Sequence, residues 1–147
     1  MNLYSKEIIR TAGLMTGTSM DGLDIVIADI SLKKNVHYQL IDDVCIPYPN
    51  NLKEKIRDAV YNPEKDHLIL DDYLGQWYAD ILYNYLQSKK INNIELIGSH
   101  GQTIYHISGK SSLQIGSPQY MAKLSLIHIS EPTRRYAISY AGFCLKK

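Results

Sequence analysis

The stretch IIRTAGLMTGTSMDGLDIVIADI, residues 8–30, decides the expected fold. The apolar run Ile8–Met15 predicts a buried strand that ends in a Gly/Thr/Ser cluster typical of a tight turn. Leu23–Ile30 is rich in β-branched residues and predicts a second strand. Because only residues 16–22 separate them, the two strands are expected to pair as an antiparallel hairpin.

Later segments extend this hairpin into a larger α/β unit. Val36–Ile46 predicts a third strand, so the chain is expected to open as an antiparallel three-strand meander. Asn50 or Asn51 is expected to cap a helix over Leu52–Tyr61, and apolar residues spaced three and four apart predict a longer helix over Asp66–Lys89. The last expected elements are a short buried strand and a hairpin, at Ile94–Ile97, Thr103–Ile107 and Ser112–Ile115. This order predicts a mixed sheet with helices packed on it.

Composition limits the classes of protein to consider. The 147 residues are 45% hydrophobic and 21% charged with a net charge of +1, which fits one ordinary soluble domain and argues against a nucleic-acid partner. No apolar run approaches the roughly 18 residues that span a bilayer, so no membrane partner is expected. The N-terminus lacks the apolar stretch of a signal peptide, which favours a cytoplasmic location. Cys45 and Cys144 form neither a disulfide framework nor a metal pattern, and Cys45 is expected to be a buried small hydrophobe.

The balance of charge changes near residue 124. Residues 1–124 carry 12 Lys and Arg against 14 Asp and Glu, whereas residues 125–147 carry 4 against 1. The segment SLIHISEPTRRYAISYAGFCLKK at 125–147 has no helical or strand period, and it resembles the peptide obtained when a sequencing-library adapter is translated as coding sequence. We therefore expect residues 1–124 to be the N-terminal part of a domain and residues 125–147 to be a non-native tail.

The loop between the first two strands is the first candidate site. Its glycines let the backbone approach a ligand closely, and its hydroxyls and amides can surround a phosphate. Asp21 and Asp24 can hold a cation or a water over that phosphate. The loop contains neither a Walker A motif nor a dinucleotide fingerprint. A polar hairpin turn with no ligand is the alternative.

The second candidate directly follows the buried strand Ile94–Ile97. His100 and Gln102 offer a proton carrier and an amide able to read a sugar or a carboxylate. Ligands in open α/β sheets collect at the carboxyl ends of strands, where these residues are expected. The alternative is a turn in which the histidine bonds to the backbone.

Three motifs, taken in order, resemble the anhydro-N-acetylmuramic acid kinase family. They are GLMTGTSMDGLD at 13–24, IGSHGQT at 97–103 and LQIG at 113–116, against the family patterns G-[LV]-M-S-G-T-S-x-D-G-x-D, G-x-H-G-Q-T and L-Q-I-G. Thr16 replaces the family's usual Ser and keeps the hydroxyl, while Ser117 stands where an Asp is common. The resemblance covers residues 8–122.

The resemblance implies an RNase-H-like domain of the sugar kinase, actin and Hsp70 superfamily, with the second domain missing from this chain. It also implies use of ATP and Mg²⁺ to phosphorylate 1,6-anhydro-N-acetylmuramic acid while water opens the anhydro ring. The product is N-acetylmuramic acid 6-phosphate, which belongs to amino sugar metabolism and peptidoglycan recycling. By this resemblance the ATP phosphate loop is Gly17, Thr18, Ser19, Met20, Asp21, Gly22, Leu23 and Asp24, and the candidates for touching the sugar are His100 and Gln102.

The resemblance places the general base outside this chain, on an Asp in a segment downstream of all three motifs. No catalytic residue is therefore expected here, the metal ligands are left unassigned, and the chain by itself is expected to be inactive. A homodimer is compatible with the family for the full-length enzyme. Three alternatives stay open: another sugar-kinase or acetate-kinase-like member of the superfamily, a non-catalytic module that binds a nucleotide or an amino sugar, and a purely structural α/β fragment.

Overall fold

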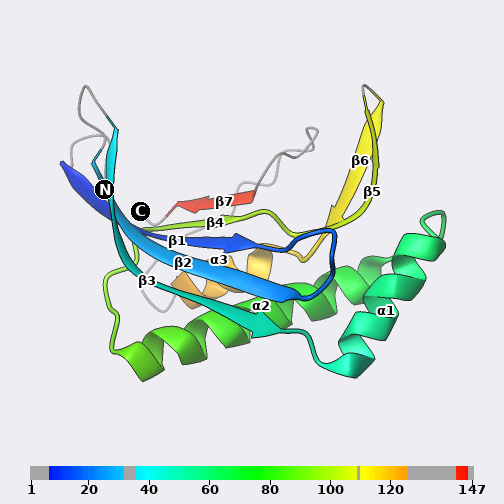
Figure 1. Cartoon of the computed structure of the whole chain (residues 1–147), viewed down its shortest axis with the longest axis horizontal. Helices are drawn as coiled ribbons and strands as arrows, with labels where there is room; N and C mark the ends of the chain where they lie inside the picture. Colours follow the sequence, from blue (N-terminus) through cyan, green and yellow to red (C-terminus); the bar gives the residue numbers. More distant parts are fainter. Residues whose placement is uncertain (1–6, 32–35, 109, 126–141, 146–147) are drawn as a thin grey trace.

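The computed structural model describes residues 7–31, 36–108, 110–125 and 142–145. Within them the chain forms a five-stranded mixed sheet, a separate two-stranded hairpin and three helices (Figure 1). In chain order the elements are β1 Ile8–Met15, β2 Gly22–Ser31, β3 His37–Pro47, α1 Asn50–Tyr61, α2 Leu68–Lys89, β4 Leu96–Ser99, β5 Gln102–Ile107, β6 Ser111–Ile115, α3 Gln119–Ser125 and β7 Gly142–Leu145. The expected α/β class with a mixed sheet is confirmed.

The large sheet has the strand order β3-β2-β1-β4-β7. β1 pairs antiparallel with β2 from Ile8 opposite Ser31 to Met15 opposite Asp24, and β2 pairs antiparallel with β3, which confirms the opening meander. β4 joins the other edge of β1 as a parallel strand, with Thr11 opposite Leu96. This parallel pairing brings the carboxyl ends of β1 and β4 to the same end of the sheet.

Strand alternation builds the core. The inward side chains of β1 and β2, such as Leu14 and Ile25, are buried on the face that α1 and α2 cover (Figure 1). The two helices supply side chains at spacings of three and four to the same core: Leu52, Ile56, Ala59, Leu74, Tyr78 and Leu82. Fully burying a side chain of this size stabilises the fold by about 1.5–3 kcal/mol, so these contacts fix how the helices lie on the sheet.

Three details differ from the sequence-based expectations. The N-cap of α1 is Pro49, whose carbonyl accepts from the amides of Leu52 and Lys53 at 2.9 Å, while Asn51 lies inside the first turn and its Oδ1 also accepts from the Leu52 amide at 2.9 Å. Cys45 is exposed, because β3 lies at the edge of the sheet and that face of the strand is uncovered. The short helix α3 was not expected, and it runs across the proposed boundary at residue 124.

Most of the expected tail lies outside the described residues, at 126–141 and 146–147. Gly142–Leu145 is described and pairs antiparallel with β4, although the tail shows no strand period. Edge strands offer unpaired backbone groups, so pairing of this kind needs no side-chain pattern. None of the helices in the described ranges is long and apolar enough to cross a membrane.

Candidate functional site

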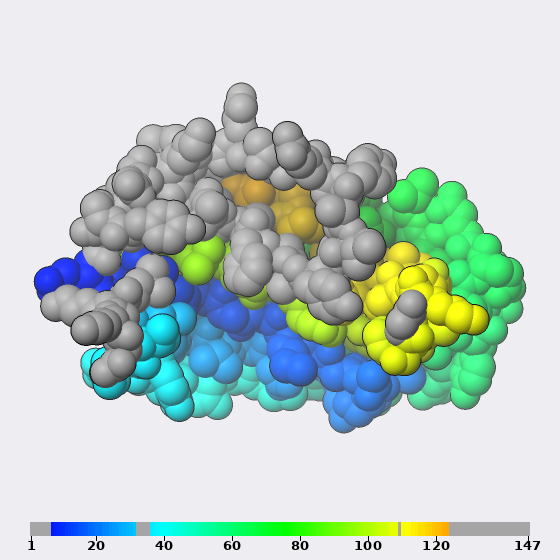
Figure 2. All heavy atoms as spheres, turned by 90° about the horizontal axis from the view of Figure 1, so that it is seen from above, coloured from blue at the N-terminus to red at the C-terminus, as the bar shows by residue number. Residues whose placement is uncertain are grey.

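The β1–β2 loop lies at the carboxyl end of β1, beside the start of β5. The Thr16 hydroxyl donates to the Gly101 carbonyl at 2.7 Å, and the His100 amide donates to the Leu14 carbonyl at 3.0 Å. The loop, the base of the β5–β6 hairpin and α1 therefore gather at one end of the sheet (Figure 1), where Figure 2 shows the yellow hairpin beside the green α1. The structure brings the two expected candidate segments together.

The loop itself is a tight turn with two backbone anchors. The Met20 amide donates to the Gly17 carbonyl at 3.2 Å, and Met20 adopts a left-handed φ of 55°. At the other end the Tyr48 amide donates to the Asp21 carbonyl at 3.0 Å. Gly22 follows directly and approaches the neighbouring strand so closely that a β-carbon would lie 2.2 Å from the Ile46 carbonyl oxygen. A side chain at this position would push the loop away from β3.

The eight expected phosphate-loop residues differ in what they can offer a ligand. Thr18, Ser19, Asp21 and Asp24 are exposed, and Gly17 and Met20 are half-buried. Gly22 and Leu23 are buried, and the Leu23 side chain belongs to the core. Exposed hydroxyls and the turn backbone are therefore the groups best placed to meet a phosphate, while Leu23 has only its backbone to offer.

A cation that sequence reasoning missed lies beside the loop. Lys53 Nζ of α1 is 3.6 Å from a carboxylate oxygen of Asp21. The pair is exposed, since the Asp21 side chain keeps 71% of its surface, so its contribution to stability is small. The ion pair keeps the ammonium group of Lys53 close to the loop. The spacing of 32 positions between Asp21 and Lys53 carries no sequence signal, because only the β3–α1 connection brings them together.

His100 is held by protein groups at both ring nitrogens. Nδ1 is 2.9 Å from the Gly101 carbonyl and Nε2 is 3.0 Å from Gln114 Nε2. A carbonyl only accepts, so Nδ1 carries a proton, and the Gln114 amide then donates to Nε2 of a neutral ring. His100 is partly exposed, and it directly precedes Gly101, whose carbonyl accepts from Thr16.

Gln102 is the centre of a buried polar network. Its side chain has no exposed surface, and its Nε2 donates to the carbonyls of Gly17 at 3.3 Å and Thr103 at 3.4 Å. Its Oε1 accepts from the Tyr48 hydroxyl at 3.2 Å, and the Tyr48 and Tyr78 hydroxyls are 2.8 Å apart. The single hydroxyl proton of Tyr48 is donated to Gln102, so the hydroxyl of Tyr78 is the donor in its bond with Tyr48. Burial raises the pKa of Tyr48 to about 12, which keeps it protonated as a donor at neutral pH.

The described residues contain no group of three or more His, Cys, Asp or Glu side chains able to hold a metal ion. Mg²⁺ bound to a nucleotide commonly takes only one or two carboxylates, with phosphate oxygens and waters as its other ligands. Asp21 and Asp24 are exposed carboxylates at the loop, so this donor set fits a nucleotide-bound Mg²⁺ and not a metal held by the protein alone.

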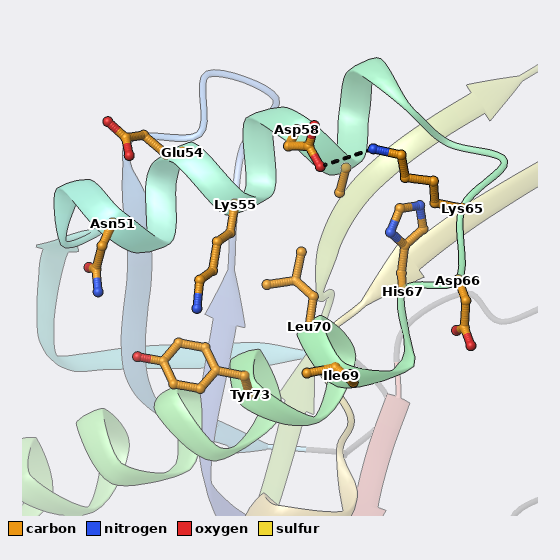
Figure 3. A pocket seen from close by; sticks show the side chains of 11 residues that line it. Asn51, Glu54, Lys55, Asp58, Lys65, Asp66, His67, Ile69, Leu70 and Tyr73 are labelled. Carbon is orange, nitrogen blue, oxygen red and sulfur yellow. Dashed lines mark ion pairs between the residues drawn. The ribbon is translucent and has the colours of Figure 1, made fainter.

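A separate hollow of about 610 Å³ lies between α1 and the start of α2 (Figure 3). Lys65 forms an ion pair with Asp58 at 3.5 Å there, and Lys55 lies over the ring of Tyr73 at 5.0 Å from its centre. Its walls carry both signs of charge and include none of the expected site residues. The hollow therefore adds nothing to the phosphate-loop site.

The fold and the site define an α/β protein whose mixed sheet carries a glycine-containing polar turn and a His-Gly-Gln segment at one end, features compatible with a kinase domain. The sequence model of anhydro-N-acetylmuramic acid kinase matches residues 9–144, and the chain belongs to this family. The matched range passes residue 124 and enters the expected tail.

Curated relatives agree with the family assignment. The chain is 32% identical over 138 residues to the anhydro-N-acetylmuramic acid kinase of Haemophilus influenzae, which covers 88% of this chain and 35% of the relative. It is 33% identical over 135 residues to that of Thiobacillus denitrificans, covering 88% and 36%, and 41% identical over 102 residues to that of Gloeothece citriformis, covering 64% and 25%. The chain thus spans about a third of the length of the curated relatives it matches. This coverage agrees with the expectation that the chain is an N-terminal fragment.

Proposed function

We propose that this chain forms the phosphate-loop part of an enzyme that transfers the γ-phosphoryl group of ATP to 1,6-anhydro-N-acetylmuramic acid. The observation that carries the proposal is the turn Gly17–Met20, in which Thr18 and Ser19 are exposed while the Gly17 carbonyl accepts from the buried Gln102 side chain. Catalysis of phosphoryl transfer depends mostly on positioning and charge stabilisation, and a braced turn with outward hydroxyls suits that task. The family name of the relatives supplies the substrate.

The proposed reaction couples opening of the anhydro ring by water to phosphoryl transfer. Water adds to C1 of the sugar and breaks its bond to the bridging O6, while O6 bonds to the γ-phosphorus of ATP and ADP leaves. One proton of the water passes to a general base, which the family resemblance places outside this chain. The product is N-acetylmuramic acid 6-phosphate, an intermediate of peptidoglycan recycling in the cytoplasm. We also propose that the 147-residue chain alone is inactive, because the resemblance assigns the general base to none of its residues.

Within this proposal the loop residues have distinct tasks. Gly17–Asp24 receives the phosphates through its backbone and through the exposed hydroxyls of Thr18 and Ser19. Asp21 and Asp24 would hold Mg²⁺, which when bound offsets the negative charge of the phosphates. Lys53 adds a positive charge at the same place. His100 is the residue we assign to the sugar because it is partly exposed, unlike Gln102, and contact through its Nε2 would require the sugar to replace the Gln114 amide.

Two structural points belong to the same proposal. The order β3-β2-β1-β4, with three antiparallel strands followed by a parallel one, supports assignment to the RNase-H-like superfamily of sugar kinases, actin and Hsp70. We also propose that residues 1–124 are native and that 125–147 are not, on the change in composition at that point. Resequencing the locus past codon 124 tests this: a stop codon after Lys147 in clean genomic reads contradicts it.

The function is tested on the gene product extended to the length of its relatives. Incubation with ATP, Mg²⁺ and 1,6-anhydro-N-acetylmuramic acid in H₂¹⁸O should yield ADP and a sugar 6-phosphate carrying one ¹⁸O, detected by mass spectrometry. Asp21→Ala and Gly17→Val should abolish turnover, whereas Tyr61→Phe, at an exposed side chain, should leave it unchanged. Near-wild-type turnover of the two loop variants means that the loop is only a turn. Micromolar ATP affinity of the 147-residue chain, measured by calorimetry, contradicts the proposal that this chain forms only part of the nucleotide site.

A further inference from the structure

We infer that Tyr48 and Gln102 are positioning residues that set the shape of the phosphate loop by holding the carbonyl group of Gly17 from inside the protein. The inference rests on the proposed function in one respect, that the loop receives a phosphate. It assigns a role to Tyr48, which has no motif signal, and it gives Gln102 a role other than contact with the sugar.

The Gly17 carbonyl accepts two hydrogen bonds, one from within the turn and one from the protein interior. It accepts the Met20 amide at 3.2 Å, which closes the turn, and the Gln102 side chain at 3.3 Å, which comes from the protein interior. A peptide group is planar and trans, so its C=O and the following N–H point in opposite directions. Holding the Gly17 oxygen inward therefore directs the Thr18 amide hydrogen outward, to the side where Thr18 and Ser19 are exposed.

Gln102 can do this only if its amide keeps one orientation. With Nε2 toward Gly17 it donates to a carbonyl, whereas a flipped amide would set its own oxygen against that carbonyl. The Tyr48 hydroxyl blocks the flip because it donates to Oε1 at 3.2 Å. Tyr78 in turn donates to Tyr48 across 2.8 Å, so the order of donors along the network is fixed from α2 to the loop.

Burial separates this role from sugar binding. Gln102 has no exposed surface and Tyr48 keeps 5% of its own. Both ends of the Gln102 amide are taken up by protein groups, so contact with a sugar would require breaking two of these bonds. The ring of Tyr48 also packs 5.2 Å from that of Trp77, so Tyr48→Phe keeps the packing and removes only the hydroxyl.

The first experiment needs no enzymatic activity and uses the 147-residue chain. Hydrogen exchange at the Met20 amide, followed by NMR, reports the turn because its acceptor is the Gly17 carbonyl. Loss of one hydrogen bond in the network should speed this exchange about 3- to 10-fold in Tyr48→Phe and in Gln102→Met. Ile56→Val, at a fully buried position of α1 outside the network, destabilises the core, so it should speed exchange of core amides through global opening while leaving the Met20 exchange rate, which reports local opening of the turn, unchanged. Wild-type exchange in both network variants overturns the inference.

The second experiment uses the extended enzyme and separates the two roles of Gln102. Tyr48→Phe and Gln102→Met should raise the KM for ATP about 3- to 10-fold, with the KM for the sugar within twofold of wild type. Ile56→Val should change neither constant. A rise in the KM for the sugar in Gln102→Met, with Tyr48→Phe like wild type, overturns the inference in favour of direct sugar contact. If the wild-type enzyme phosphorylates no sugar, the proposed function fails, and the exchange experiment alone decides the positioning role.

Discussion

Gly22 provides a direct test of how the loop is built. It begins β2 opposite Pro47, and a β-carbon placed there would lie 2.2 Å from the Ile46 carbonyl oxygen and 2.8 Å from Pro47 Cα. These are backbone atoms of the neighbouring strand, so rotation of a side chain cannot relieve the overlap. Gly22→Ala must therefore separate β2 from β3 at the loop, next to the bond from the Tyr48 amide to the Asp21 carbonyl.

Gly13 is the matched control. It too lies in a strand without a left-handed φ, but the nearest atom to its added β-carbon, the Val26 carbonyl oxygen, is 3.9 Å away. Overpacking costs about 1–3 kcal/mol, and backbone overlap should put Gly22→Ala at about 2–3 kcal/mol. A compatible Gly→Ala change stabilises by about 0.4–1 kcal/mol through the unfolded chain. At about 2–4 °C per kcal/mol for a chain of this size, Gly22→Ala should lower Tm by about 4–12 °C and Gly13→Ala should raise it by about 1–4 °C.

The assay is thermal and urea unfolding followed by the fluorescence of Trp77. It is the single tryptophan of the chain, and its ring lies 5.2 Å from that of Tyr48, so it reports on the end of the sheet that Gly22 disturbs. A wild-type Tm for Gly22→Ala refutes the close approach of β2 to β3. Equal losses for both glycines refute it as well, because only at Gly22 would the added β-carbon lie within 3 Å of backbone atoms.

Two further predictions concern charge. Arg10 donates to both carboxylate oxygens of Asp29 at 2.8 Å and holds the pKa of that carboxyl below its ordinary value, so the pair stabilises the fold above about pH 4 and the stabilisation is lost as pH falls through the lowered pKa. Arg10→Gln should therefore cost about 0.5 kcal/mol at pH 7 and less at pH 2, as urea titrations at the two pH values measure, and an equal cost at both pH values contradicts the ion pair. Asp24 faces Cys45 across β2 and β3, and its hydrogen bond and charge raise the pKa of the thiol, together with some burial. In a Cys144→Ser background, Asp24→Asn should speed alkylation of Cys45 by iodoacetamide at pH 8 about two- to fivefold, and an unchanged rate counts against this contact.

The sequence sufficed to predict elements but not their neighbours. β1, β2 and α2 follow from apolar periods that are local to each segment, so their type and place were predictable. The exposure of Cys45 depends on strand order. An alternating sequence such as that of β3 is typical of an edge strand and of a central strand alike, so it does not predict which strand lies at the edge. Contact partners such as Lys53 and Tyr48 come from outside the motifs, and only the closed fold brings them to the loop.

Hydrogen bonds around the β1–β2 loop connect the three motifs at 13–24, 97–103 and 113–116. Leu14 accepts from His100, Thr16 donates to Gly101, and the Gly17 carbonyl accepts from Gln102, so the first two motifs satisfy each other's polar groups across 85 residues. The third motif joins through Gln114, which contacts His100 at 3.0 Å. The Thr16 hydroxyl and the Gln102 amide are buried, so leaving either unpaired would cost about 1–3 kcal/mol, whereas the contact between His100 and Gln114 is only partly buried. Every contact named here lies between residues 14 and 114. The contacts that shape the β1–β2 loop therefore lie within the first 124 residues, upstream of the segment that we propose is not native.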